Sequence, residues 1–125
     1  MKCLLRDEAG RVVWVRHTYG DRGAWELPGG AARRSESPVQ AARREAREEL
    51  GVDVATWEVV GAAEGRWTGA HLQLTCCVAD CPPGARLDPD PVEIAVVVWA
   101  PVDEPPGRVG QVTARTLLLL KGAVR

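Results

Sequence analysis

The chain has 125 residues, of which 46% are hydrophobic and 26% charged, a composition typical of one soluble globular domain rather than a disordered segment. Its 17 acidic and 16 basic side chains nearly cancel, which argues against a nucleic-acid binder that relies on phosphate attraction alone. No apolar run approaches the roughly 20 residues of a membrane-spanning helix, and the charges close to Met1 are not typical of a signal peptide. We therefore expect a single cytoplasmic domain over residues 1–125, with no membrane partner.

Two strand-like segments come first. Residues 2–6 are short and apolar, and residues 11–17 alternate between polar and apolar side chains, with Val13 and Val15 on one face. After a polar loop, residues 25–27 are extended, because a proline follows them and disfavours helix in the residue before it. The first part of the chain therefore predicts a hairpin followed by a long loop.

Residues 38–50 carry the clearest helix signal. Ser37 is a typical N-cap, Pro38 suits the first helical position, and Gln40 completes a Ser-x-x-Gln capping box. Gly51 is placed to end the helix in a left-handed conformation. The helix buries an apolar stripe with two small members, which allows close packing: Val39, Ala42, Ala46 and Leu50.

The second half contains three more strand-like runs and a final helix. We expect strands over residues 57–62, 71–79 and 94–100, and a helix over about residues 109–121. The run 94–100 is almost continuously apolar, which predicts a strand covered on both faces. Strands interleaved with two helices predict a sheet with helices packed on it.

Four cysteines do not form a zinc-binding pattern. Cys76 and Cys77 are adjacent, so on a strand they point to opposite faces and do not share a metal. We interpret the set as small apolar side chains in a reducing compartment: Cys3, Cys76, Cys77 and Cys81.

Three glutamates share one face of the predicted helix, at spacings i, i+3 and i+4: Glu45, Glu48 and Glu49. Stability alone does not favour this arrangement, because each like-charged pair costs about 0.2–0.5 kcal/mol and acids in a last turn oppose the helix dipole. A solvated face with ion pairs to nearby arginines is one interpretation. A cluster of metal-binding carboxylates is the other.

A longer fixed pattern surrounds these glutamates: Gly30, five residues, Glu36, seven residues, and then Arg44-Glu45-Ala46-Arg47-Glu48-Glu49-Leu50-Gly51-Val52. It resembles the Nudix box, G-x5-E-x7-R-E-U-x-E-E-x-G-U with U apolar, at every defined position. The preceding Trp25-Glu26-Leu27-Pro28-Gly29-Gly30 is also similar to the family's approach to that box. The resemblance implies an α/β protein with the Nudix fold, a mixed β-sheet sandwiched between helices, over the whole chain.

The resemblance further implies a reaction. Nudix hydrolases cleave diphosphate linkages, so we expect a metal-dependent hydrolase that cleaves the pyrophosphate linkage of a nucleoside diphosphate joined to another group, by water attack on phosphorus. The expected cofactor is Mg²⁺ or Mn²⁺, since hard cations suit carboxylate oxygens and neutralise phosphate charge. The alternative is a Nudix-fold module that binds a nucleotide and regulates without turnover. Intact glutamates favour the hydrolase.

Residue roles follow from the same resemblance. It implies that the three glutamates bind metal and that one of them accepts a proton from water, without saying which. The implied catalytic residues are Glu45, Glu48, Glu49 and Arg44. Arg44 is implied to pair with Glu36 and hold the loop against the helix. The structural positions of the motif are Gly30, Glu36 and Gly51.

Two further metal ligands are candidates. The Gly29 carbonyl is either a ligand or part of a plain tight turn, because glycine lets the main chain approach an ion closely. Glu93, just before the last strand, is either a ligand or an exposed loop acid. Two other acids of the same loop stand in reserve for this role: Asp88 and Asp90.

Three residues are candidates for substrate binding. Arg16 either contacts phosphate or forms a surface ion pair, and Trp25 either stacks on a base or, as its size favours, packs in the core. Arg33 and Ser35 stand where many family members have an acid and a glycine, so Arg33 adds positive charge beside the expected site. The chain begins close to its first strand, so an edge strand of relatives is absent or comes from a second copy. A homodimer is therefore a candidate assembly.

Overall fold

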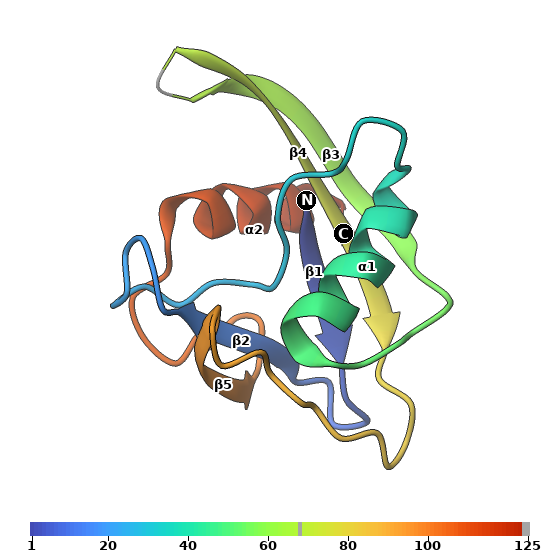
Figure 1. The fold of residues 1–125 in the computed structure, drawn as a ribbon. Helices are drawn as coiled ribbons and strands as arrows, with labels where there is room; N and C mark the ends of the chain where they lie inside the picture. The colour runs from blue at the N-terminus through green and yellow to red at the C-terminus, as the bar shows by residue number, and fades with distance from the viewer. Residues whose placement is uncertain (68, 124–125) are drawn as a thin grey trace.

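The computed structural model describes residues 1–67 and 69–123, and the chain forms a sheet with a helix on each face (Figure 1). In the described part, the elements in chain order are β1 (Lys2–Arg6), β2 (Val12–His17), α1 (Pro38–Leu50), β3 (Glu58–Trp67), β4 (Ala70–Asp80), β5 (Ile94–Ala100) and α2 (Gln111–Ala123). No helix among these residues is long and apolar enough to cross a bilayer.

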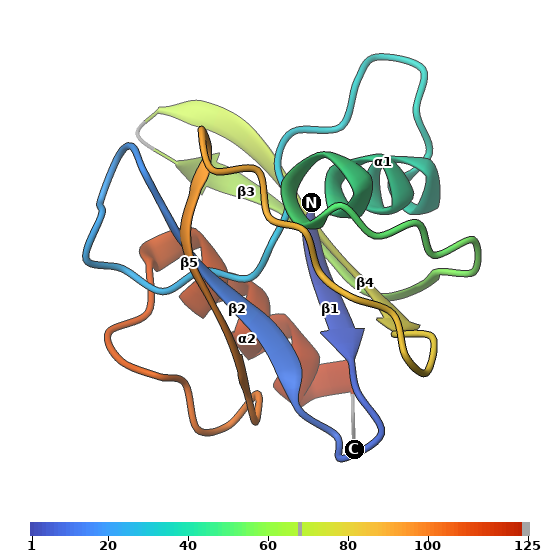
Figure 2. The ribbon, with the colours of Figure 1, turned by 60° about the horizontal axis from the view of Figure 1, so that its bottom comes forward.

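The sheet is mixed, with the strand order β3-β4-β1-β2-β5. Strand β1 runs parallel to β4, and the other neighbouring pairs are antiparallel. Helices α1 and α2 cover opposite faces (Figure 2), and each face has its own buried cluster. The prediction of a mixed sheet between helices is therefore confirmed.

Strand alternation divides the core between the two faces. Cys3 and Leu5 of β1 pack with α1, whereas Leu4 between them packs on the α2 side. Cys77 and Cys76 divide in the same way, as their adjacency predicts. All four cysteines are free thiols.

Two strands differ from the prediction. Strand β5 is the outermost strand next to β2, and beyond buried Ile94 it is only half-buried, with Ala95 exposed. The strand is therefore covered less than expected: Val97 and Trp99 pack partly buried on the α1 side and Ala100 on the α2 side, because the edge of the sheet is where the cover of the two helices ends. Strand β3 continues to Trp67 instead of ending near residue 62, since its polar second half pairs with β4 in a hairpin that projects beyond the sheet (Figure 1).

Helix α1 begins and ends where its sequence predicts. The Ser37 side chain accepts a hydrogen bond from the Gln40 amide, and the Gln40 side chain accepts one from the Ser37 amide. Gly51 takes φ of 65°, and its amide donates to the Arg47 carbonyl. These caps fix the register of the helix, and hence which face each glutamate occupies.

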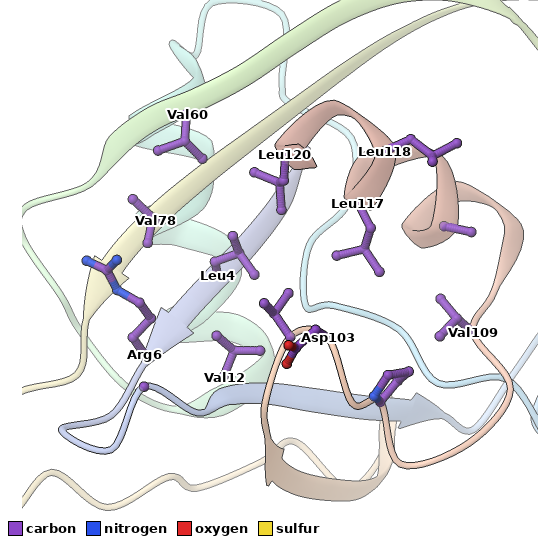
Figure 3. Close-up of a pocket in the computed structure, with 14 residues that line it drawn as sticks. Leu4, Arg6, Val12, Val60, Val78, Asp103, Val109, Leu117, Leu118 and Leu120 are labelled. Atoms are coloured by element: carbon purple, nitrogen blue, oxygen red, sulfur yellow. The ribbon is translucent and has the colours of Figure 1, made fainter. Parts of the chain in front are cut away.

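Helix α2 packs less closely on the other face. A cavity of about 630 Å³ lies between it and the sheet (Figure 3). Its lining is mostly apolar and includes Leu4, Val12, Val60, Val78, Leu117 and Leu120. The helix starts at Gln111 rather than Val109, because Val109 pairs with Trp25 in an isolated bridge.

Candidate active site

The site begins where the loop after β2 contacts the start of β1. Gly29 has φ of 148°, and a Cβ atom there would lie 2.1 Å from the Met1 carbonyl oxygen. The Gly30 amide donates to that same oxygen at 3.0 Å. A Cβ on Gly30 would lie 2.6 Å from Glu45 Oε1. Glycine is therefore needed at position 29, where the loop lies against the backbone of β1, and a side chain at position 30 would displace the Glu45 carboxylate.

Arg44 ties this loop to α1. Its Nε and Nη2 donate to the two oxygens of Glu36 at 2.7 and 2.8 Å, and Nη2 also donates to the Ala31 carbonyl at 3.2 Å. The hydrogen bonds from Arg44, together with the Arg33 amide, lower the pKa of Glu36 to about 2, and the same pairing raises the pKa of Arg44. The two-pronged ion pair holds the loop against the helix, the role expected for these residues.

The three glutamates have different surroundings. The Glu49 side chain is only 3% exposed, and its Oε2 accepts a hydrogen bond from the Gly29 amide at 3.4 Å. Glu45 is also buried, and burial and the charge of Glu49 raise its pKa. Glu48 is half-exposed and accepts hydrogen bonds from Arg33 at 3.3 Å and Arg44 at 3.1 Å. Two carboxylates thus point inward beside the loop, and one lies at its rim.

This donor set fits a hard divalent cation. Carboxylate and carbonyl oxygens are the ligands Mg²⁺ prefers, and two neighbouring buried carboxylates carry charge that a cation would neutralise. Among the described residues, no three His, Cys, Asp or Glu side chains already stand as a metal cage. Arg44 Nη1 instead donates to both Glu45 and Glu48 at 3.1 Å. A metal ion would therefore compete with Arg44 for these oxygens.

The loop before β5 completes the end of α1. The Asp88 amide donates to the Leu50 carbonyl at 2.7 Å, and the Asp90 amide donates to the Glu49 carbonyl at 3.0 Å. These bonds give hydrogen-bond partners to two backbone carbonyls in the last turn of α1, the turn that carries Glu48 and Glu49. The Asp90 carboxylate accepts the Val92 amide, so it is engaged within its own loop.

Glu93 lies at the end of β2. Its carbonyl accepts the Thr18 amide at 2.9 Å. The charges of Glu49, Glu93 and Glu45 all contribute to the raised pKa of the Tyr19 phenol, after burial, which places the three carboxylates within electrostatic reach of one ring. The role of Glu93 as a metal ligand stays a prediction.

The substrate-binding candidates divide between two faces. The Arg16 guanidinium lies 5.0 Å from the centre of the Trp25 ring, and Trp25 packs against the cluster on the α2 side. This favours the core-packing interpretation of Trp25, with Arg16 covering it. Arg33 lies at the site, where it contacts Glu48.

The sequence interpretation missed His17. Its Nε2 lies 3.8 Å from Glu49 Oε1, and its side chain is 12% exposed. Alternation along β2 gave the signal, because Val13 and Val15 face α1 and His17 is the next residue of that series. The sequence instead favours Arg16, one position earlier, as the residue of this strand that approaches the site.

Comparisons with known proteins bear on the family and the fold of the chain. The sequence model of the NUDIX domain matches residues 1–120. A MutT-like protein from Streptomyces ambofaciens is 32% identical over 111 residues, which cover 89% of this chain and 68% of that protein. An RNA pyrophosphohydrolase from Saccharophagus degradans is 40% identical over 62 residues, half of this chain and 36% of that protein.

A solved structure shares the fold. The MutT NUDIX hydrolase from Burkholderia pseudomallei superposes with a TM-score of 0.79 over 95% of this chain and 94% of its own, at 21% identity. The chain therefore matches that fold along nearly all of its length, while it spans about a third of the RNA pyrophosphohydrolase.

Proposed function

The chain belongs to the Nudix family, and from this membership we propose that it is a metal-dependent hydrolase of pyrophosphate bonds in nucleotide-type substrates. The proposed reaction is attack of water on phosphorus, which releases two phosphorylated products. The proposed cofactor is Mg²⁺ or Mn²⁺.

One observation carries the proposal. The Glu49 carboxylate is almost completely buried, yet among the described residues the basic side chain beside it is His17, whose Nε2 lies 3.8 Å from Glu49 Oε1. Glu45 lies beside it, and burial and the charge of Glu49 raise its pKa even though Arg44 donates to it at 3.1 Å. A fold that needed only stability would not keep two such carboxylates together.

Each residue then has a defined task. Glu45, Glu48 and Glu49 would hold the metal, with the Gly29 carbonyl and Glu93 as further candidate ligands, and one glutamate would accept the proton of the attacking water. When bound, the metal would neutralise phosphate charge and make the water more acidic. Arg44 would release Glu45 and Glu48 to the metal while it keeps the loop fixed through Glu36.

The substrate class follows from charge at the rim. Arg33 and Arg34 are exposed on the loop beside Glu48, so they are placed to attract a polyphosphate. The name of one relative, an RNA pyrophosphohydrolase, adds RNA that carries a pyrophosphate bond to the candidates. A second copy of the chain as partner and a cytoplasmic location remain predictions.

The test is hydrolysis of a panel of substrates in the presence of Mg²⁺, with the two phosphorylated products separated and identified by chromatography. The panel contains nucleoside triphosphates, nucleotide sugars, ADP-ribose, dinucleoside polyphosphates and short 5′-triphosphate RNA. We expect turnover of at least one member and a loss of at least about a hundredfold in Glu49→Gln, because the substitution removes a charged ligand. Glu8→Gln, in the exposed turn after β1, is the matched control and should retain full activity.

Two results would change the proposal. Equal rates for wild type and Glu49→Gln would contradict the assigned site. Tight binding of one panel member without turnover would favour the regulatory module instead.

A further inference from the structure

The side chain of His17, at the end of β2, lies beside Glu49, the most buried carboxylate of the site. His17 is the last residue of β2, where the pairing with β5 shifts register between Arg16 and His17. The Tyr19 ring packs against the imidazole, with ring centroids 5.0 Å apart. The shifted strand and the tyrosine together fix the imidazole in its position next to Glu49.

The Nε2 atom of this imidazole is buried and has no hydrogen-bond partner. Buried polar atoms normally find a partner, so an unpartnered one calls for an explanation. Its nearest acidic neighbour is Glu49 Oε1 at 3.8 Å, a gap too short for an intervening water and slightly too long for a hydrogen bond. A small side-chain rotation would close it.

We propose that His17 is a positioning residue that donates its Nε2–H to Glu49 Oε1 and so orients this carboxylate for the divalent cation. Glu49 would then be held at both oxygens, at Oε2 by the Gly29 amide and at Oε1 by His17. The remaining lone pairs of the carboxylate would face the metal. This inference rests on the proposed function, because it takes a metal ion as the ligand of Glu49.

A neutral donor suits this position better than an arginine or lysine. Outer residues that hydrogen-bond a ligating carboxylate fix its orientation, and their loss commonly lowers metal affinity about 10- to 100-fold. A fixed positive charge at Glu49 would oppose the cation, as Arg44 does at Glu45 and Glu48. His17 can orient Glu49 without bringing such a charge.

The first test is a titration of the full chain with Mn²⁺ in the absence of substrate. The EPR signal of free Mn²⁺ measures how much of the ion is bound. His17→Phe keeps a ring against Tyr19 but removes the donor, and His17→Gln restores an N–H at about the same reach. We expect His17→Phe to weaken binding about tenfold and His17→Gln to stay within about threefold of wild type. His71→Phe is the control, since His71 is 66% exposed on β4, and it should bind as wild type does.

A double-mutant cycle then separates positioning from general damage. In the Glu49→Gln background, His17→Phe should cost no further affinity, because the carboxylate it orients is gone. A further tenfold loss in that background would overturn the inference. Equal losses in His17→Phe and His17→Gln would overturn the role of the N–H donor.

A third measurement needs no variant. The chain has two histidines, so long-range ¹H–¹⁵N spectra resolve the imidazole of His17. We expect its neutral form to carry the proton on Nε2, and a proton on Nδ1 alone would overturn the inference.

The outcomes also distinguish this inference from the proposed function. Mn²⁺ affinity that Glu49→Gln leaves unchanged would contradict the metal site itself. If Glu49→Gln lowers the Mn²⁺ affinity and His17→Phe does not, the role of His17 is contradicted and the proposed metal site is not.

Discussion

The two helices lie on opposite faces of one sheet and are held in different ways. Helix α1 has a capping box at its start, a left-handed glycine and a docked loop at its end, and small alanines against the strands. Helix α2 is held by two fully buried threonines, Thr113 and Thr116, and by Leu117 and Leu120, and it leaves a cavity of about 630 Å³ between itself and the sheet (Figure 3). None of the three glutamates of the box lines that cavity.

This difference separates support from function within a small domain. A metal ligand must be held within fractions of an ångström. The caps of α1 and the loop docked at its end fix the helix that carries the three glutamates. The face under α2 has only to exclude water from apolar side chains, which tolerates imperfect packing. Substitutions on the α1 face should therefore change catalysis, and equivalent ones on the α2 face should change stability alone.

Among the changes that compare the two helix faces, Arg44→Lys is expected to have the largest effect. A lysine cannot make the two-pronged bond to Glu36 and reach Glu45 and Glu48 together, so we expect kcat/KM to fall about thirtyfold. Arg43→Lys is the matched control, because Arg43 makes the same kind of bond to Asp53 on the outer side of α1. Steady-state kinetics on the best panel substrate measure both. A similar loss in the two variants would show that activity depends on two-pronged arginine pairs along α1 in general, and not on the position of Arg44.

Gly51→Ala should destabilise the fold through two separate effects. Alanine at a φ of 65° is strained by about 1–2 kcal/mol, and its Cβ would also lie 2.6 Å from the Asp88 carbonyl oxygen. Gly10→Ala is the comparison, since Gly10 has φ of 80° but nothing within 4 Å of an added Cβ. Urea unfolding should show a larger loss for Gly51→Ala. Equal losses would mean that the loop at Asp88 moves away from α1 freely.

Adding carbon atoms on each face compares the packing directly. Ala46 is fully buried against the sheet, so Ala46→Val should destabilise the fold by about 1–3 kcal/mol through overpacking. Val78 lines the cavity under α2, so Val78→Ile should stabilise the fold by about 0.5–1 kcal/mol. Free energies of unfolding in urea measure both. A destabilising Val78→Ile would show that the cavity is closed in solution.

The parts predicted correctly were those determined by local chemistry. The ends of α1 depend on Ser37, Gln40 and Gly51, each acting within a few residues, so the sequence is enough to place them. The length of β3 depends on pairing with β4 across a hairpin, which its polar side chains do not reveal. The position of β5 at the sheet edge depends on the order of all the strands.

The sequence predicts which residues form the site, but not the hydrogen bonds and ion pairs between them. The motif identified the glutamates, Arg44 and Glu36, but the sharing of Arg44 between Glu45 and Glu48 depends on side-chain conformations. His17 was within reach of sequence reasoning, because the alternation that set Val13 and Val15 against α1 continues to it. A one-residue choice along a strand exchanges the two faces, which is why Arg16 was selected instead.

The smallest expected effect concerns pH and the bond between Glu36 and Arg44. Its hydrogen bonds lower the pKa of Glu36 from 4.5 to about 2, so the bond should stabilise the fold fully above pH 4.5. That contribution should decrease as the pH falls from 4.5 toward 2, because the carboxylate becomes protonated. The difference in Tm between wild type and Glu36→Gln should therefore be positive at pH 6 and vanish near pH 2. Asp53→Asn, which breaks the outer pair with Arg43, should show a loss in the same direction, since that pair also lowers the pKa of Asp53. Only Glu36→Gln should also weaken Mn²⁺ binding, and an equal weakening in Asp53→Asn would mean that the inner pair has no special role in holding the loop at the site.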